Sequence, residues 1–392
     1  MNLRVYVLAL STFAFGSGAL IFAGLLEPMA ADLGVSVGAV GQLQTTYVLT
    51  SALAGPPLAF LAGRFERRGL LLTALAVAVI LNLACYLTAS FPALLVLRAV
   101  LGATAALAGP AASAAASALV PMERRGSALA VVTGGMTVAF LMGIPLGSVV
   151  GSAFGWRTAF LLSAALAAFA FVAILAYLPK VRPPGPQAGE GLRAGLVLPL
   201  FASTFLAFGA NMTITTYIAP ILRLQAGVTG AGVAAFQMLV GVGSFLGLTL
   251  GGRAADRQAG GLSVTLAFAG LAVGAGLHGL ELSGGAPEGL PTYLVVGLTV
   301  LIGSTSLFSV MPVIQSRLIQ RAPAAAPLAL AFNGSSAALG QAFGGALGGL
   351  LITQAGAPSV TFASAVIALS AAGFWWLTNG RAQPSPAKLA AS

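Results

Sequence analysis

Long apolar runs, each about twenty residues or more, repeat along almost the whole chain and are separated by short segments with charged residues, Gly or Pro. About twenty apolar residues is the length that an α-helix needs to cross the hydrocarbon core of a bilayer. The runs lack the alternation of a membrane β-strand. The pattern therefore predicts twelve membrane-spanning helices, approximately at 4–26, 38–62, 70–89, 93–119, 127–152, 157–178, 195–221, 230–252, 262–280, 291–313, 326–352 and 359–378.

The longest polar connection falls between the sixth and seventh spans. It begins at Pro179 and stays polar to Arg193, and its prolines exclude a continuous helix. It divides the chain into a six-helix bundle over 1–178, a cytoplasmic linker over 179–194 and a second six-helix bundle over 195–378. Residues 379–392 are rich in Pro, Ala and Ser, and we expect a flexible cytoplasmic tail.

Equivalent motifs recur at equivalent places in the two halves. Basic loops follow the second and eighth spans, and small residues recur at intervals of four in the fifth and eleventh spans. The loop residues are Arg64, Arg68, Asp256 and Arg257. The small residues are Gly143, Gly147 and Gly151 in the fifth span and Gly340, Gly344 and Gly348 in the eleventh, and Pro145 lies between the first two. Glycines at i and i+4 allow two helix backbones to approach closely in lipid. We expect these faces to support a sliding contact as the halves move.

Composition and charge agree with an all-α membrane protein. The chain of 392 residues is 58% apolar and 7% charged, which excludes a soluble domain. Its net charge of +10 would favour nucleic acid in a soluble protein, but the basic residues stand in short clusters between spans, so we expect no nucleic-acid partner. Fifteen of the eighteen Lys and Arg residues fall on one side of the predicted topology, which places both termini in the cytoplasm.

Three motifs carry a resemblance to a known family. They are Glu27-Pro28-Met29-Ala30-Ala31-Asp32-Leu33-Gly34, Leu97-Arg98-Ala99-Val100-Leu101-Gly102 and Gly143-Ile144-Pro145-Leu146-Gly147 followed by Gly155-Trp156-Arg157. With the two six-helix halves, the chain resembles the major facilitator superfamily, and within it the drug and sugar proton-antiporters of the arabinose-efflux type. The resemblance implies a monomeric exporter of a small molecule in a bacterial inner membrane.

One position departs from that family. The family's first loop motif has an Asp before the residue that is Arg64 here, whereas this chain has Gly63. The second copy keeps Asp256 before Arg257. The resemblance implies that the Asp helps to latch the cytoplasmic side, so a latch in the first half would lack that carboxylate.

Arg98 is the only Lys or Arg in the interior of a predicted span, since Arg4 and Arg157 stand at the first position of theirs. A charge at bilayer depth costs roughly 2.5 to 3.5 kcal/mol, so it needs a partner or a function. Two interpretations remain open. In one, Arg98 pairs with Glu27, and substrate binding changes the protonation of that carboxyl and so couples transport to protons. In the other, Glu27 is a solvated loop acid and Arg98 binds carbonyls of a neighbouring helix.

Uncharged polar residues within the spans are the candidates for substrate contact. We single out Tyr47, Gln44, Asn211, Tyr217, Gln237 and Asn333. In hydrocarbon such groups must find partners, either on other helices or on a substrate in a cavity. We interpret His278, the sole histidine, as an interfacial residue near Glu281 without a special role.

These features favour a secondary exporter that works by alternating access in exchange for protons. A proton-independent uniporter or a symporter of the same fold is the alternative. An intramembrane enzyme is disfavoured, since one His and one Cys offer no metal ligand set and no HExxH is present. We expect no cofactor. The sequence contains no nucleotide-binding motif, so we do not expect an ATP-driven pump.

Overall fold

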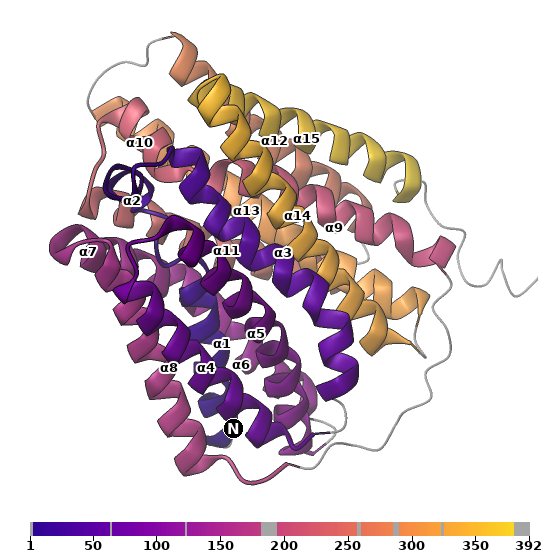
Figure 1. Ribbon diagram of the computed structural model, residues 1–392. Helices are drawn as coiled ribbons and strands as arrows, with labels where there is room; N and C mark the ends of the chain where they lie inside the picture. The colour runs from indigo at the N-terminus through magenta and orange to yellow at the C-terminus, as the bar shows by residue number, and fades with distance from the viewer. Residues whose placement is uncertain are drawn as a thin grey trace, which may run out of the picture.

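The computed structural model describes residues 3–62, 65–121, 124–181, 194–256, 260–284, 290–322 and 325–379 (Figure 1). In this part of the chain every regular element is a helix. The first half holds α1 (Leu3–Leu20), α2 (Leu26–Leu33), α3 (Val37–Ala62), α4 (Arg67–Leu87), α5 (Phe91–Ala118), α6 (Arg125–Val138), the π-helical turn η2 (Ala139–Gly143), α7 (Ile144–Phe154) and α8 (Arg157–Tyr177). The second half holds α9 (Ala194–Thr215), α10 (Ile218–Ala226), α11 (Ala231–Asp256), α12 (Gly260–Gly284), α13 (Leu290–Arg321), α14 (Ala326–Gln354) and α15 (Ala357–Asn379).

The membrane fold predicted from the apolar runs is confirmed. Eleven segments in the described residues are long and apolar enough to cross a membrane. The helix α3 adds a twelfth long helix, and its first half carries the polar residues Gln42, Gln44, Thr45 and Thr46. One buried apolar cluster is built mainly by α1 to α8, and another by helices between α9 and α15. Figure 1 shows α3 and α14 running side by side where the two bundles meet.

The first helix of each half is broken, where the sequence predicts continuous spans over 4–26 and 195–221. In the first half α1 ends at Leu20, and residues 21–25 turn before α2 begins. In the second half α9 ends at Thr215 and α10 begins at Ile218. Both short helices end at a glycine with left-handed backbone, Gly34 (φ 64°) and Gly227 (φ 62°). This conformation favours glycine, which has no Cβ to clash.

The fifth span contains a π-helical turn, η2, between α6 and α7. Pro145 lacks an N–H and cannot donate to the carbonyl of Leu141, four residues earlier. The N–H of Ile144 reaches back instead to Ala139, five residues away. The wider turn places Phe140 against Phe308 of α13, with ring centroids 5.4 Å apart. Pro145 therefore shapes a contact between the two halves.

The glycine faces of the fifth and eleventh spans pack inside their own halves, not between the halves as expected for a sliding contact. A side chain on any of these glycines would meet the first helix of the same bundle or the turn after it. The facing pairs are Gly143 with Ser17, Gly147 with the carbonyl of Ile21, Gly340 with the carbonyl of Phe205, and Gly344 with the carbonyl of Gly209. Gly345 and Gly349, next along α14, face α3 of the other half.

Candidate functional site

Arg98 is fully buried and is held by the end of α1. Its guanidinium donates to the carbonyls of Gly18 (2.9 Å) and Ala19 (2.6 Å), and more distantly to Oε1 of Gln44 (3.4 Å). The Arg98 Cζ lies 4.4 Å from the ring centroid of Tyr47 and 4.9 Å from that of Phe22.

The break in α1 explains this site. The last four carbonyls of a helix have no partner within the helix, and they carry the negative end of its dipole. Because α1 stops at Leu20, the carbonyls of Gly18 and Ala19 are among those four. A guanidinium can satisfy both carbonyls, since it presents several donors in one plane. The aromatic faces add a favourable contact with the cation.

Glu27 is paired with a different arginine from the one expected. Its Oε1 lies 3.0 Å from Nη2 of Arg223, and the Glu27 side chain is 27% exposed. The direct pair of Glu27 with Arg98 is absent from this structure, where Arg98 binds carbonyls instead. Glu27 lies in the first turn of α2 and Arg223 near the end of α10, so the ion pair joins the short helices that follow the two breaks. Figure 1 shows these helices together, at the end of the molecule far from the N-terminus.

Other polar links between the halves gather toward the same end, hereafter the α2/α10 end. Tyr217, in the break between α9 and α10, is fully buried and donates to the carbonyls of Gly345 (2.9 Å) and Gly38 (3.5 Å). Ser148 of α7 donates to Gln237 of α11 (2.6 Å). Two of the predicted substrate residues, Tyr217 and Gln237, therefore join the halves here.

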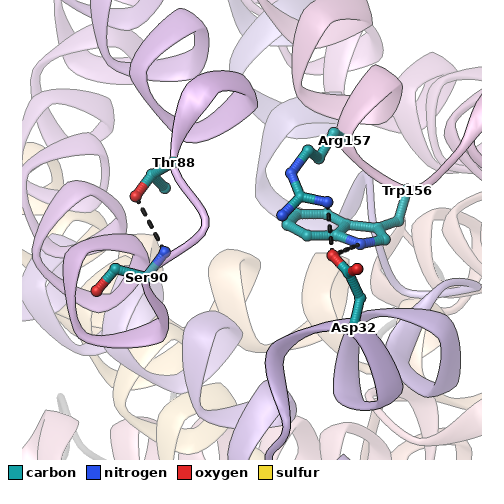
Figure 2. Close-up of polar contacts among 5 residues, drawn as sticks. All are labelled: Asp32, Thr88, Ser90, Trp156 and Arg157. Atoms are coloured by element: carbon teal, nitrogen blue, oxygen red, sulfur yellow. Dashed lines mark hydrogen bonds and ion pairs between the residues drawn. The ribbon is translucent and has the colours of Figure 1, made fainter.

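A second charged cluster braces α2 against its own half (Figure 2). Arg157 lies over the ring of Trp156, and both side chains donate to the carboxylate of Asp32. These hydrogen bonds hold the pKa of Asp32 below its usual value. The short helix α2 is thus fixed to the start of α8 and also paired with α10.

Figure 2 also shows the turn from α4 to α5, where the N–H of Ser90 donates to the hydroxyl of Thr88.

The remaining predicted substrate residues lie at separate places. Tyr47 covers Arg98, and Gln44 accepts from it while its own Nε2 has no partner. Asn333 accepts from Thr204 of α9 (2.7 Å), which joins two helices of the second half. Asn211 lines a cavity inside the second bundle. The structure does not gather the six residues into one pocket.

Buried hydroxyls without a partner mark the contact between α3 and α14. Thr45 of α3 and Thr216 of the α9–α10 break both lie beside Gly345, and neither hydroxyl has a hydrogen-bond partner. A buried polar group without a partner costs about 1 to 3 kcal/mol, so these two hydroxyls are candidates for contact with a ligand. Neither hydroxyl was singled out from the sequence.

Each bundle holds a small cavity, and the two are lined by corresponding helices. The first cavity, of about 10 Å³, lies beside Arg98 and is lined by α1, α3, α4, α5 and α8. The second, of about 50 Å³, is lined by α9, α10, α11, α12, α13 and α15 and contains His278. His278 is only 3% exposed, so its side chain faces the interior of the second bundle.

The loop motifs are only partly described. Arg64, Arg257 and Gly63 lie outside the described residues, and Asp256 is the last residue of α11. Arg68 donates to the carbonyl of Leu175 (2.8 Å) at the end of α8. This contact stays within the first half.

Glu66 caps α4 within the same loop. It accepts from the backbone N–H groups of Arg68, Gly69 and Val181 at 2.8 to 2.9 Å. Burial alone would raise the pKa of Glu66, but these donors outweigh it and hold the pKa below its usual value. The carboxylate ties the chain after α8 to the start of α4.

Arg223, Gln225 and Ser148 are contact residues that the sequence did not single out. Their partners lie 53 to 196 residues away along the chain, so no local pattern reveals them. Among the described residues, no three His, Cys, Asp or Glu side chains gather where they could hold a metal ion.

Comparison with known proteins gives a consistent result. The family model described as "Major Facilitator Superfamily" matches residues 8–326. The chain is 31% identical to the chloramphenicol resistance protein of Streptomyces lividans, over 79% of this chain and 81% of that protein. It is 28% identical to the inner membrane transport protein YdhP of Escherichia coli K12, over 90% of each. Its fold is similar to a crystal structure of the peptide transporter POT in complex with sulfate, with a TM-score of 0.77, 16% identity and coverage of 96% and 93%.

Proposed function

Because this chain belongs to the Major Facilitator Superfamily, we propose that it exports a small molecule by alternating access, in exchange for protons. The observation that carries this proposal is the clustering of polar links between the halves at the α2/α10 end. The Glu27–Arg223 ion pair, the Tyr217 hydroxyl and the Ser148–Gln237 hydrogen bond all join the halves there. Three separable links at one end form a gate between the halves.

The moving units in this proposal are the two bundles, 1–178 and 195–378, connected by the linker 179–194. Both termini lie in the cytoplasm, the membrane is a bacterial inner membrane, and the protein acts as a monomer. The α2/α10 end then faces outward, because α1 runs from the N-terminus toward it. Closing this end directs the substrate site toward the cytoplasm, as loading of an exporter requires.

Glu27 is the proposed coupling acid. A protonated Glu27 has no charge to hold Arg223, so proton binding from outside weakens the gate, and in the proposed exchange the proton then leaves toward the cytoplasm, which restores the ion pair. The buried hydroxyls of Thr45 and Thr216 and the amide of Gln44 are the proposed substrate contacts. They are uncharged, which favours a neutral substrate. Chloramphenicol is the first compound to test, in view of the Streptomyces relative.

Transport in proteoliposomes tests the proposal. Labelled chloramphenicol and a panel of sugars are offered with and without an imposed pH gradient, and a protonophore is added in a parallel series. We expect gradient-driven movement of one compound class that the protonophore abolishes. Substrate movement that the protonophore does not affect would indicate uniport and contradict proton exchange. Substrate movement in the same direction as protons would indicate symport.

The variant Glu27→Gln tests the coupling residue. We expect it to lose gradient-driven accumulation while it still exchanges labelled for unlabelled substrate, because the amide cannot carry a proton. Asp32→Asn is the matched control, since Asp32 lies on the same short helix but contacts only Arg157 and Trp156 of its own half. If Glu27→Gln retained full gradient-driven transport, the coupling role of Glu27 would be refuted.

A further inference from the structure

His278 is buried between three helices, and both of its ring nitrogens have a polar partner. Its Nδ1 lies 3.0 Å from Oε1 of Gln225 on α10, and its Nε2 lies 2.9 Å from the hydroxyl of Thr299 on α13. His278 itself belongs to α12. The imidazole therefore connects three elements of the second half.

The hydrogen bonds of Gln225 determine which ring nitrogen carries the hydrogen. The Gln225 Nε2 donates to the carbonyl of His278 (3.1 Å) and to Oε2 of Glu281 (2.9 Å). With its NH₂ group used in this way, Gln225 presents its oxygen to Nδ1, which must then be the N–H donor. In the neutral ring Nε2 is left as the acceptor. A proton can bind at this atom.

Thr299 can satisfy Nε2 in both protonation states. Its single hydroxyl hydrogen has two acceptors in reach, Nε2 of His278 at 2.9 Å and the carbonyl of Val296 at 2.8 Å. When the ring is neutral, the hydroxyl donates to Nε2. When Nε2 carries a proton, Nε2 donates to the hydroxyl oxygen and the hydroxyl turns to Val296. One rotation of a hydroxyl thus accommodates the added proton.

The surroundings give the proton a route and few competing charges. The cavity of about 50 Å³ beside His278 and Thr299 is also lined by Asn211, Thr215 and Ser304. Such a volume holds a few waters, which need polar partners of this kind. The helices α9, α11, α13 and α15 bring no charged side chain to the cavity. Among the described residues, Gln225 connects the imidazole to one charged side chain, that of Glu281 on α12.

We propose that His278 is a proton-binding site of the second half, with Nε2 as the atom that takes the proton. Gln225 and Arg223 lie on the same short helix, α10, so the state of the imidazole is connected to the Glu27–Arg223 gate. The role in transport rests on the proposed proton exchange, whereas proton binding itself does not.

The sole histidine makes the site directly observable. Protein labelled with ¹⁵N-histidine and purified through a histidine-free tag gives the signals of one imidazole in nuclear magnetic resonance, one for each ring nitrogen. Between about pH 8 and pH 3, we expect Nδ1 to remain protonated throughout and Nε2 to begin to take up a proton reversibly as the pH falls. A ring that stays neutral across this range, or one that is protonated first at Nδ1, would overturn the proposal.

Two variants should move the titration midpoint in opposite directions. Thr299→Val removes the acceptor for the protonated Nε2 and should lower the midpoint by about one pH unit, since hydrogen bonds to charged groups are the stronger ones. Gln225→Glu places a carboxylate beside Nδ1 and should raise it. A midpoint that neither variant moves would show that the hydrogen bonds described here do not govern proton binding at Nε2, which would overturn the proposal.

The transport role has its own readout. His278→Gln keeps polar contacts but cannot carry a proton, so we expect gradient-driven transport to fall at least about tenfold while substrate exchange persists. If the wild-type protein ignored the pH gradient while His278 still titrated at Nε2, the proposed proton exchange would fail and the proton site would stand. If wild-type transport were gradient-driven and His278→Gln left it unchanged, the role of His278 in transport would fail.

Discussion

The guanidinium of Arg98 is a buried charge whose partners are carbonyl dipoles and aromatic faces, not a carboxylate. The sequence shows that a charge lies in the fourth span, and its cost indicates that it must be compensated. The compensating groups could not be predicted from the sequence, because the carbonyls of Gly18 and Ala19 become available only where α1 breaks. The apolar residues Ile21, Phe22 and Ala23 give no local sign of that break.

Arg98→Lys should destabilise the protein although the charge is kept. An ammonium is a compact donor without the flat fork that reaches two carbonyls and packs between rings. We expect a loss of about 2 kcal/mol, measured as a lower midpoint of thermal unfolding in detergent. Arg68→Lys is the control, since Arg68 makes one carbonyl contact at an exposed site and should change little. Equal midpoints for Arg98→Lys and the wild type would contradict the two-carbonyl account.

At the scale of elements, the hydrophobic pattern predicts the spans well, and it fails where a helix is interrupted. The break at Thr216 and Tyr217 is followed by Pro220, which has no N–H to donate to the carbonyl of Thr216, and the π-helical turn is visible only as Pro145. Each of these two interruptions therefore has a proline as its local sign. The left-handed glycines Gly34 and Gly227 were the local signal available for the short helices α2 and α10.

Glycines of α14 allow a matched test of close packing. Gly344→Ala would drive a methyl group into the carbonyl of Gly209, which cannot move aside, and should cost about 1 to 3 kcal/mol. Gly334→Ala in the same helix meets open space and should be neutral or stabilising by up to about 1 kcal/mol. Thermal unfolding of the two variants measures the difference. Similar midpoints would mean that α9 and α14 are not in backbone contact at Gly344.

The cap of α4 should make stability depend on acidity. Because the folded protein holds the pKa of Glu66 below its unfolded value, the carboxylate stabilises the fold above about pH 4, and this contribution is lost as the pH falls through the folded pKa. Glu66→Ala should cost about 1 kcal/mol at neutral pH. The gap between the variant and the wild type should close toward about pH 3, as followed by denaturation. Glu66→Gln keeps an acceptor oxygen and cannot titrate, so it should lose only the part of the pH dependence that comes from Glu66.

At the scale of the whole molecule, the sequence predicts two bundles but not how they touch. Glu27 and Arg223 were placed on the same side by their spans, yet nothing in either segment pairs them, because the contact depends on the packing of both bundles. The same holds for Ser148 with Gln237. Contacts between halves connect residues far apart in the chain, and a single sequence does not indicate which distant residues are in contact.

Charge reversal tests whether Glu27 and Arg223 act as a pair. Glu27→Arg or Arg223→Glu places like charges together at the α2/α10 end, and each should slow transport several-fold by holding the gate open. The combined variant restores opposite charges and should recover much of the rate. Substrate transport by all four proteins measures the coupling, and additive losses in the combined variant would show that the pair does not act as a unit.

The broken helix α1 also has a consequence for biosynthesis. Arg98 follows Gly18 by 80 residues, so α1, α2 and α3 emerge from the ribosome before the group that holds the break exists. Tyr217 likewise precedes its acceptor Gly345 by 128 residues. The first helix of each half therefore enters the membrane before the residues that contact its break in the folded protein have been synthesised.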